Sequence, residues 1–415
     1  MTEDTKIHQR PVLRNLQFSP IKQGEEQLVV LWDPTGLSAE RLIVPLNYFY
    51  LFQFFDGEHS LDQIAAQYLK QFGEFLMPDR LEKLVEELDA KLFLEGARLE
   101  SARTAADAAY RAQPVRKPAF AGRMYEADPN KLRAQLSGYY SSQEGPPIKD
   151  SAHKGQRIKG VVAPHYDPTQ AGAVYAWAYK EVQEADIPEL FILLGTCQAG
   201  LQQGFAVTEK DFETPLGLVS VDRALIERFK AQGGEPFFLE ERAHQHEHSL
   251  EFQLPFLQHA VAGRRPITIF PVLCAFPPAC LTDPDLRDLA EMVQKFVAAL
   301  KDSLSGIGKD YCLIAGAELA HVGMRYGDSK PPTDFSFHKC MQSDMAMLKH
   351  VENLEPDVFA QFLLKEGDAR RISGFAPIYT LLKLIQAEKG EVLRYDRGIT
   401  DQFNSTVTFA SIAFY

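Results

Sequence analysis

Four continuous apolar runs in the second part of the chain constrain its fold more than any other feature. They occupy Ile158–Ala163, Leu190–Leu194, Ile267–Leu273 and Cys312–Ala315. Runs without polar alternation suit strands that are buried on both faces of a sheet. Helices are expected at Thr169–Ala185, Asp222–Phe229, Ser249–Val261, Leu286–Leu300 and Gly374–Gln386, and further strands at Glu391–Tyr395 and Ser405–Tyr415. Alternating strands and helices predict one large α/β domain.

The first 97 residues follow a different pattern, in which short strands precede helices. Strands are predicted at Gln27–Trp32 and Leu42–Leu46, followed by an aromatic helix at Asn47–Phe55. Ser60 and Gln63 have the spacing of a capping box, which starts a second helix. A third helix opens at Pro78 and places apolar side chains on one face, namely Leu81, Leu84, Val85, Leu88 and Leu92. This order predicts a small α+β winged-helix domain.

A linker is predicted between these two parts. Residues 98–117 are rich in Ala, Arg and Gln and have no apolar core pattern, and the segment closes with Pro114-Val-Arg-Lys before Pro118. The sequence therefore predicts a winged-helix module at residues 1–97, a linker at 98–117 and an α/β domain at 118–415.

Composition narrows the classes of function. The chain carries 44 Lys and Arg against 56 Asp and Glu, a net charge of -12, which disfavours a nucleic-acid partner or an anionic membrane. No apolar run is long enough for a transmembrane helix, and the polar N-terminus lacks a signal-peptide core, so a cytoplasmic location is expected. Five scattered cysteines without a CxxC pair predict neither disulfides nor a zinc knuckle, and Cys274 and Cys312 are expected to be buried.

Histidines and carboxylates stand at the edges of the apolar runs. His165 follows the first run, Glu247 and His248 precede a predicted helix, and Glu318 and His321 follow the fourth run. Because ligands of α/β proteins bind outside the carboxyl ends of strands, these side chains are expected to converge on one cleft. Imidazole and carboxylate suit iron or copper, and they also suit acid–base catalysis. The alternative for each histidine taken alone is a hydrogen-bonded or surface role.

The N-terminal segment resembles a known family. Leu51–Ala66, with Phe55-Asp-Gly-Glu-His-Ser-Leu-Asp-Gln-Ile64 at its centre, is similar to the PqqD-like family, and Leu88–Glu95 fits that family's closing helix. The resemblance implies a winged-helix module that adds a precursor peptide as a strand to a sheet edge. A peptide or protein partner is therefore expected for residues 1–97.

Residues 118–415 resemble the Memo family. The resemblance rests on Phe120–Tyr125, Ala163-Pro-His165, Phe191–Gly195, Glu247–Glu251, Ile269–Leu273, His321-Val-Gly323 and Ile372-Ser-Gly374. It implies the fold of LigB-type extradiol dioxygenases, with a central mixed sheet. It also implies that the protein belongs to an AmmeMemoRadiSam set of proteins. The partners in that set are a radical S-adenosylmethionine protein and an AMMECR-type protein. Some members are metal-binding redox proteins and others are phosphotyrosine-peptide adaptors.

The resemblance also assigns a metal site, which this chain alters. The family's first metal histidine matches His165, whereas its histidine pair matches Gln198 and Ala199 and its cysteine matches Ser373. The cofactor-binding positions are therefore occupied by Gln198 and Ser373, whose neutral side chains are weaker metal ligands. A degraded metal site is expected. The alternative is a rescued iron or copper site, in which His165, His248, Glu318 and His321 serve as ligands and catalytic residues. Cys197 is a further donor if it turns inward.

Other polar residues have two interpretations each. His244 and His246 would share one face of a strand with His248 and bind metal adventitiously, but a solvated loop is favoured. Arg370 and Arg371 either hold an anionic group at a pocket rim or are solvated.

Three functions remain from the sequence. A binding or scaffold component with a degraded metal site follows from the loss of ligands. A metal-dependent redox enzyme follows from the surviving imidazoles and carboxylates. A metal-free hydrolase or lyase with His165 or His248 as base has no nucleophile elbow to support it.

Overall fold

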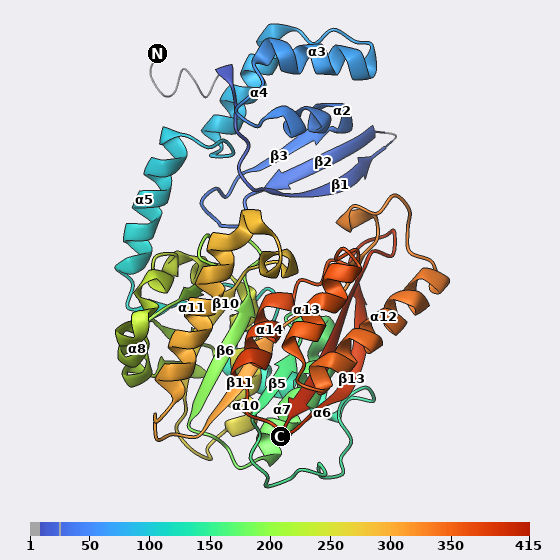
Figure 1. The fold of residues 1–415 in the computed structure, drawn as a ribbon. Helices are drawn as coiled ribbons and strands as arrows, with labels where there is room; N and C mark the ends of the chain where they lie inside the picture. Colours follow the sequence, from blue (N-terminus) through green and yellow to red (C-terminus); the bar gives the residue numbers. More distant parts are fainter. Residues whose placement is uncertain (1–8, 25) are drawn as a thin grey trace. The chain divides into compact units, whose positions relative to one another are not determined.

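The chain forms two compact units, Met1–Gln113 and Pro114–Tyr415 (Figure 1). The computed structural model describes residues 9–24 and 26–415. Helix α5 (Ala97–Arg111) occupies most of the segment predicted as a linker and belongs to the first unit, and β4 (Val115–Arg116) begins the second. Alanine-rich sequence favours a helix even where no amphipathic pattern is visible.

The first unit places helices beside an antiparallel sheet. Its strands lie in the order β1 (Gln17–Gln23), β2 (Glu26–Trp32) and β3 (Arg41–Pro45). Its helices are α2 (Leu46–Phe49), a 3-10 turn at Tyr50–Phe54, α3 (Leu61–Phe72) and α4 (Pro78–Ala90). The predicted capping box of α3 is confirmed, because the Ser60 hydroxyl accepts from the Gln63 amide and the Gln63 side chain accepts from the Ser60 amide.

Strand β1 was not predicted from the sequence. It contains Pro20 and is largely exposed, so it lacks an apolar run. It is an edge strand of this sheet, with β2 on one side. Proline is tolerated in an edge strand because one row of backbone groups has no ladder partner there.

The second unit contains the predicted mixed sheet. Its main path runs β12-β14-β5-β11-β6-β10-β9-β8-β4. The four apolar runs form the parallel centre, comprising β5 (Gly160–Ala163), β11 (Tyr311–Gly316), β6 (Leu190–Thr196) and β10 (Thr268–Cys274). The remaining strands are β7 (Phe205–Val207), β8 (Asp211–Thr214), β9 (Gly217–Val221), β12 (His321–Val322), β13 (Gly390–Ile399) and β14 (Thr406–Phe414). The α/β prediction with a central mixed sheet is confirmed.

Helices cover both faces of this sheet (Figure 1). One layer contains α6 (Pro129–Ser141), α7 (Pro168–Glu184) and α10 (Gln253–Val261), which pack on one another. The other contains α11 (Arg287–Leu304), α13 (Pro356–Lys365) and α14 (Phe375–Leu384). The remaining helices are α8 (Arg223–Phe229), α9 (His248–Glu251) and α12 (Asp334–Glu352). Two helical layers explain why the central strands are apolar throughout.

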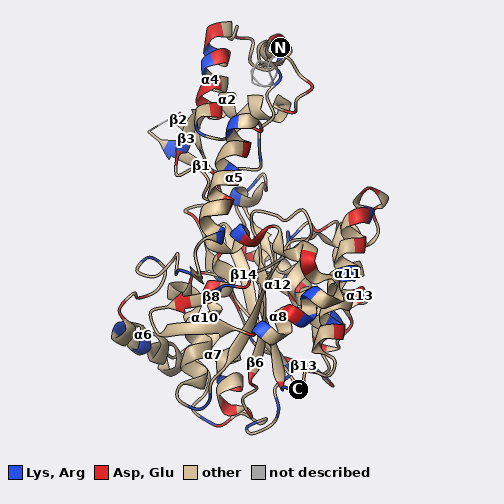
Figure 2. Cartoon of the chain, turned by 90° about the vertical axis from the view of Figure 1, so that its left-hand side faces the viewer, with Lys and Arg blue, Asp and Glu red and all other residues tan. Residues whose placement is uncertain are grey.

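The surface carries charges of both signs. Figure 2 shows Asp and Glu interspersed with Lys and Arg along the helices, including α4, where Asp79, Arg80, Glu82 and Lys83 alternate in sign. Within residues 9–24 and 26–415, no helix has the length and apolar character that crossing a membrane requires.

Phe256 tests the packing of the α7–α10 layer. The Phe256 side chain is 1% exposed, and its ring stacks on that of Tyr175 with 4.5 Å between centroids. Phe256→Ala is expected to lower the free energy of unfolding of the second unit by about 3–5 kcal/mol, because it leaves a cavity. Urea unfolding followed by Trp177 fluorescence in a Trp32→Phe background measures this. The control Leu218→Ala, at a side chain that is 54% exposed, should change it by less than about 0.5 kcal/mol. Equal effects of the two variants would contradict the packing.

Candidate functional site

The predicted histidines and carboxylates meet at the carboxyl ends of β5, β6 and β11. His165 follows β5, Glu318 and His321 follow β11, and α9 starts at His248. Helix α9 approaches the sheet closely because Gly195 and Gly316 lack side chains. A Cβ on Gly316 would lie 2.6 Å from the Ser249 carbonyl oxygen, and one on Gly195 would lie 2.5 Å from Ser249 Oγ.

His165, His248 and Glu247 form a chain of contacts. His165 Nδ1 lies 3.2 Å from His248 Nε2, and His248 Nδ1 lies 3.0 Å from Glu247 Oε1. Glu247 is the N-cap of α9, where its carboxylate accepts from the backbone amides of His248 at 2.7 Å and Ser249 at 3.1 Å. The cap therefore fixes the start of α9 and the direction of the His248 ring together.

Glu318 and His321 form a second pair beside the first. His321 Nε2 lies 3.1 Å from Glu318 Oε2, and its Nδ1 faces the carbonyl oxygens of Leu319 and Arg371 at 3.1 and 3.2 Å. The other oxygen, Glu318 Oε1, lies 3.7 Å from His165 Nδ1. Glu318 therefore joins the two histidine pairs into one cluster.

Burial and charge set the protonation states in this cluster. Burial lowers the pKa of His165 to about 4, against the attraction of Glu318, so His165 is neutral at pH 7. Burial alone would raise the pKa values of Glu247 and Glu318. Neighbouring histidines and hydrogen bonds outweigh it and lower both pKa values to about 2. Burial also opposes protonation of His248, but the Glu247 carboxylate beside it raises its pKa.

The two positions expected to bind a cofactor are placed differently. Gln198 is exposed and contributes its backbone amide, which donates to Glu247 Oε2 at 3.0 Å. Ser373 precedes Gly374, whose amide donates to the Glu318 carbonyl oxygen at 2.9 Å. Ser373 Oγ is buried and has no hydrogen-bond partner among the described residues, and the same holds for His165 Nε2.

No group of three or more His, Cys, Asp or Glu side chains within residues 9–24 and 26–415 is arranged to hold a metal ion. Instead, the ring nitrogens of His248 and His321 face partners within the protein. The thiol of Cys197 is buried, 3.7 Å from the Gly200 carbonyl oxygen, and burial raises its pKa, so it is held in the neutral form.

Two expectations for polar residues near the site are wrong. His244 does not lie in a solvated loop. It is 1% exposed, and its Nε2 lies 3.0 Å from the Ala206 carbonyl oxygen. Arg370 is buried and not solvated, because it pairs with Asp344 and Glu366. The Arg371 side chain is 40% exposed, and it pairs with Asp328 at 2.7 Å.

Sequence reasoning missed the charged residue that supports α9. Arg116, 1% exposed, pairs with Glu251 and donates to the carbonyl oxygens of His244 and Glu247 at 3.0 and 2.9 Å. Glu251 also accepts from the Phe120 amide at 2.8 Å and the Tyr125 hydroxyl at 2.6 Å. Glu251 lies one turn into α9, and this position in the sequence was a signal that it belongs to the site. Nothing in the local sequence distinguished Arg116 from its basic neighbours.

Comparisons with known proteins match this chain to one family. The sequence model described as Memo-like protein matches residues 116–413. A MEMO1 family protein of Aquifex aeolicus is 23% identical over 392 residues, covering 93% of this chain and 96% of the relative. MEMO1 family proteins of Methanothermobacter thermautotrophicus and Sulfolobus acidocaldarius are 29% and 30% identical, covering 72% of this chain and 100% and 99% of their own lengths. The Aquifex match is longer than the second unit, so it extends into the first.

His244 gives the second unit a pH-dependent stability. Burial lowers its pKa to about 3, whereas an exposed histidine titrates near 6.5. The unfolded chain binds the proton that the folded state excludes. Stability is therefore full above about pH 6.5 and falls as the pH drops toward 3. Urea unfolding should show this loss between about pH 7 and 5, a window above the carboxylate titrations. His244→Gln should make the dependence on pH shallower. An unchanged slope in this variant would contradict burial of a neutral His244.

Proposed function

This chain belongs to the Memo-like protein family, and on that premise we propose that it is a binding or scaffold component with a degraded metal site. In this proposal the second unit supplies a stable body and the first unit captures a peptide. The protein would act within an AmmeMemoRadiSam-type system in the cytoplasm, with a radical S-adenosylmethionine protein and an AMMECR-type protein as its partners.

The observation that carries the proposal is the mutual pairing of the site's own donors. Both ring nitrogens of His248 and of His321 face partners in the protein, as does Nδ1 of His165. These three histidines have six ring nitrogens. Among the described residues, His165 Nε2 is the one of the six without a partner. A metal would have to displace buried ion pairs to gain further imidazole ligands, and breaking one partner of a buried pair costs about 3–5 kcal/mol.

The replaced positions add to this argument. Gln198 is exposed, and its backbone amide donates a hydrogen bond to Glu247. This contact gives the buried cluster no further atom that could bind a metal. Ser373 offers a neutral hydroxyl, which is a weak ligand for iron or copper compared with thiolate or imidazole.

The first unit supports peptide capture at a sheet edge. β1 pairs with β2 along one side, so its other side presents backbone groups to an added strand. An apolar cavity of about 880 Å³ lies beside β1, lined by residues that include Leu16, Phe18, Leu31, Phe49 and Phe52. The Phe18 side chain is 49% exposed. A peptide added to β1 could place an apolar side chain in this cavity.

A metal-dependent redox enzyme is the second candidate. It would use His165, His248, Glu318 and His321, with iron or copper bound. One observation favours it: His165 Nε2 and Ser373 Oγ are both buried without a hydrogen-bond partner in the described part of the chain. Such atoms are rare in proteins and call for an occupant or a water molecule.

Metal content separates the two candidates. Iron, copper and zinc are quantified in untagged protein after anaerobic reconstitution with each metal, for the wild type, His165→Ala and the control His338→Ala, whose residue is exposed on α12. The proposal predicts less than stoichiometric metal in all three, because the donors remain paired. Stoichiometric metal in the wild type and His338→Ala that is lost in His165→Ala would establish the enzyme candidate instead.

Peptide capture is tested with the full chain and a displayed library of random peptides. Peptides selected on the wild type should bind Phe18→Asp at least about tenfold more weakly, because a charge in the apolar cavity must be desolvated. Ile43→Asp is the matched control, since Ile43 lies on β3 and is 56% exposed. Loss of binding in Ile43→Asp with retention in Phe18→Asp would overturn the assignment to β1.

A further inference from the structure

Aromatic rings from several elements of the first unit line the cavity beside β1. Phe18 comes from β1, Phe49 from α2 and Phe72 from α3, and Tyr50 and Phe52 of the 3-10 turn complete the set. The ring centroids of Phe18 and Phe49 lie 4.8 Å apart, and the Phe72 ring meets that of Tyr50 edge-on at 5.3 Å. Ring edges and faces at these spacings form a surface that suits a further aromatic ring.

Polar side chains at this cavity already have partners within the first unit. Arg14 is the charged residue among the described residues that line it, and its guanidinium pairs with the Asp33 carboxylate at 2.7 Å. The Asn47 side chain donates to the Tyr68 hydroxyl at 2.6 Å and accepts from the Tyr48 amide at 3.0 Å. A charged occupant would lose its water and would have to compete for groups that are already bonded. The cavity therefore favours an apolar occupant.

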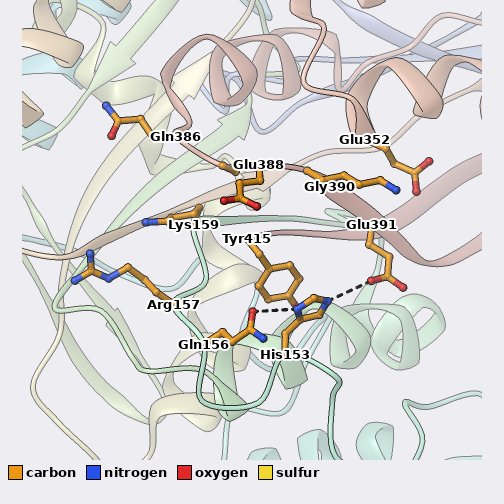
Figure 3. A pocket seen from close by; sticks show the side chains of 12 residues that line it. His153, Gln156, Arg157, Lys159, Glu352, Gln386, Glu388, Gly390, Glu391 and Tyr415 are labelled. Carbon is orange, nitrogen blue, oxygen red and sulfur yellow. Dashed lines mark hydrogen bonds and ion pairs between the residues drawn. The ribbon is translucent and has the colours of Figure 1, made fainter.

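The large cavity of the second unit has the opposite character. Charges of both signs line it without separation, and Figure 3 shows Lys159 beside Glu388 near the Tyr415 ring. Lys389 also lies among the carboxylates of that lining. Such a mixture favours no single class of ligand, whereas the lining beside β1 selects against charge.

The register of the sheet decides which side chains of an added strand would face the cavity beside β1. Phe18 lies directly opposite Leu31 of β2, and both line the cavity. Because side chains alternate along a strand, the neighbours Gln17 and Ser19 point to the other face of the sheet. An added strand alternates in the same way, so its residues i and i+2 would face the cavity, roughly 6.6–6.8 Å apart.

The cavity is long enough for two such positions. Leu16, two residues before Phe18, also lines it, so the cavity follows one face of the chain across both residues. Its volume of about 880 Å³ is that of a site for a whole small molecule, which leaves room for two large side chains.

We infer that the peptide captured by the first unit carries two large apolar side chains separated by one residue, at least one of them aromatic. This inference rests on the proposed addition of a peptide to β1 and names the sequence class of that peptide. The aromatic side chain lies against the Phe18–Phe49 pair, and the second apolar side chain lies beside Leu16. The residue between them points to the other face of the sheet and is unrestricted. A charged residue at either cavity-facing position is excluded.

Selection of a displayed library of random peptides on the full chain, followed by sequencing, tests the inference. The bound peptides should be enriched in two apolar residues spaced by one, with an aromatic residue at one of the two positions. One of them is then synthesised with single changes, and its binding is measured by fluorescence anisotropy. Aromatic to leucine should weaken binding about two- to tenfold. Aromatic to alanine, or a glycine inserted within the pair, should weaken it at least about tenfold. Alanine at the intervening position should change it less than about twofold.

Phe18→Leu tests the source of the aromatic preference. Phe18 is 49% exposed, so the variant keeps an apolar side chain without emptying the core. It should still bind the selected peptides, but the preference for an aromatic residue over leucine should fall to near equality, because one ring of the pair is gone. Phe335→Leu, at a side chain of α12 that is 81% exposed, should keep the preference of the wild type.

Two kinds of failure are distinguishable in these measurements. Peptides that lose binding in Phe18→Asp but lack the spaced apolar pair, or that tolerate the inserted glycine, would overturn this inference and leave capture at β1 standing. Absence of selected peptides, or equal binding to Phe18→Asp and the wild type, would contradict the proposed capture itself.

Discussion

Charges that are taken out of water must be paired inside the protein, and this requirement organises the candidate site. Glu247 and Glu318 are almost fully buried, and each is held by a histidine and by backbone amides or a second histidine. An unpaired carboxylate at this depth would be destabilising by several kcal/mol. The histidines are therefore needed for the stability of the charged site itself. In the proposed degraded site, this pairing is a reason for the histidines to be retained.

The same requirement extends outward from the site. Arg116 and Glu251 form a buried pair behind α9, and the carbonyl oxygens that Arg116 binds belong to His244 and Glu247. On the other side, Asp344 is fully buried between Arg370, Tyr395 and Thr408, while the Arg370 carbonyl oxygen accepts from the His321 amide at 2.7 Å. These two networks fix the segments that carry His248 and His321. Such support is what orients buried polar groups in other preorganised sites.

Much of the fold and part of the site could be predicted from the sequence, for physical reasons. Strands buried on both faces must be apolar throughout, so β5, β6, β10 and β11 were visible as runs, and polar residues at their ends identified His165, Glu318 and His321. Pairing between distant residues leaves no local pattern. The Arg116–Glu251 and Asp344–Arg370 contacts span 135 and 26 residues, so Arg116 resembled a linker residue and Arg370 a solvated charge. The burial of His244 and the exposure of Gln198 likewise depend on tertiary contacts.

In the proposed function, the imidazoles of this site pair with groups of the protein and do not bind a metal. Nitrogen-15 spectra of the histidine side chains, recorded anaerobically while one equivalent of Zn²⁺ is added, measure this pairing. The ring-nitrogen resonances of His165, His248 and His321 are expected to keep their positions, because their hydrogen bonds persist. Displacement of the His165 Nε2 resonance to a metal-bound position, together with changes at His248 or His321, would contradict it.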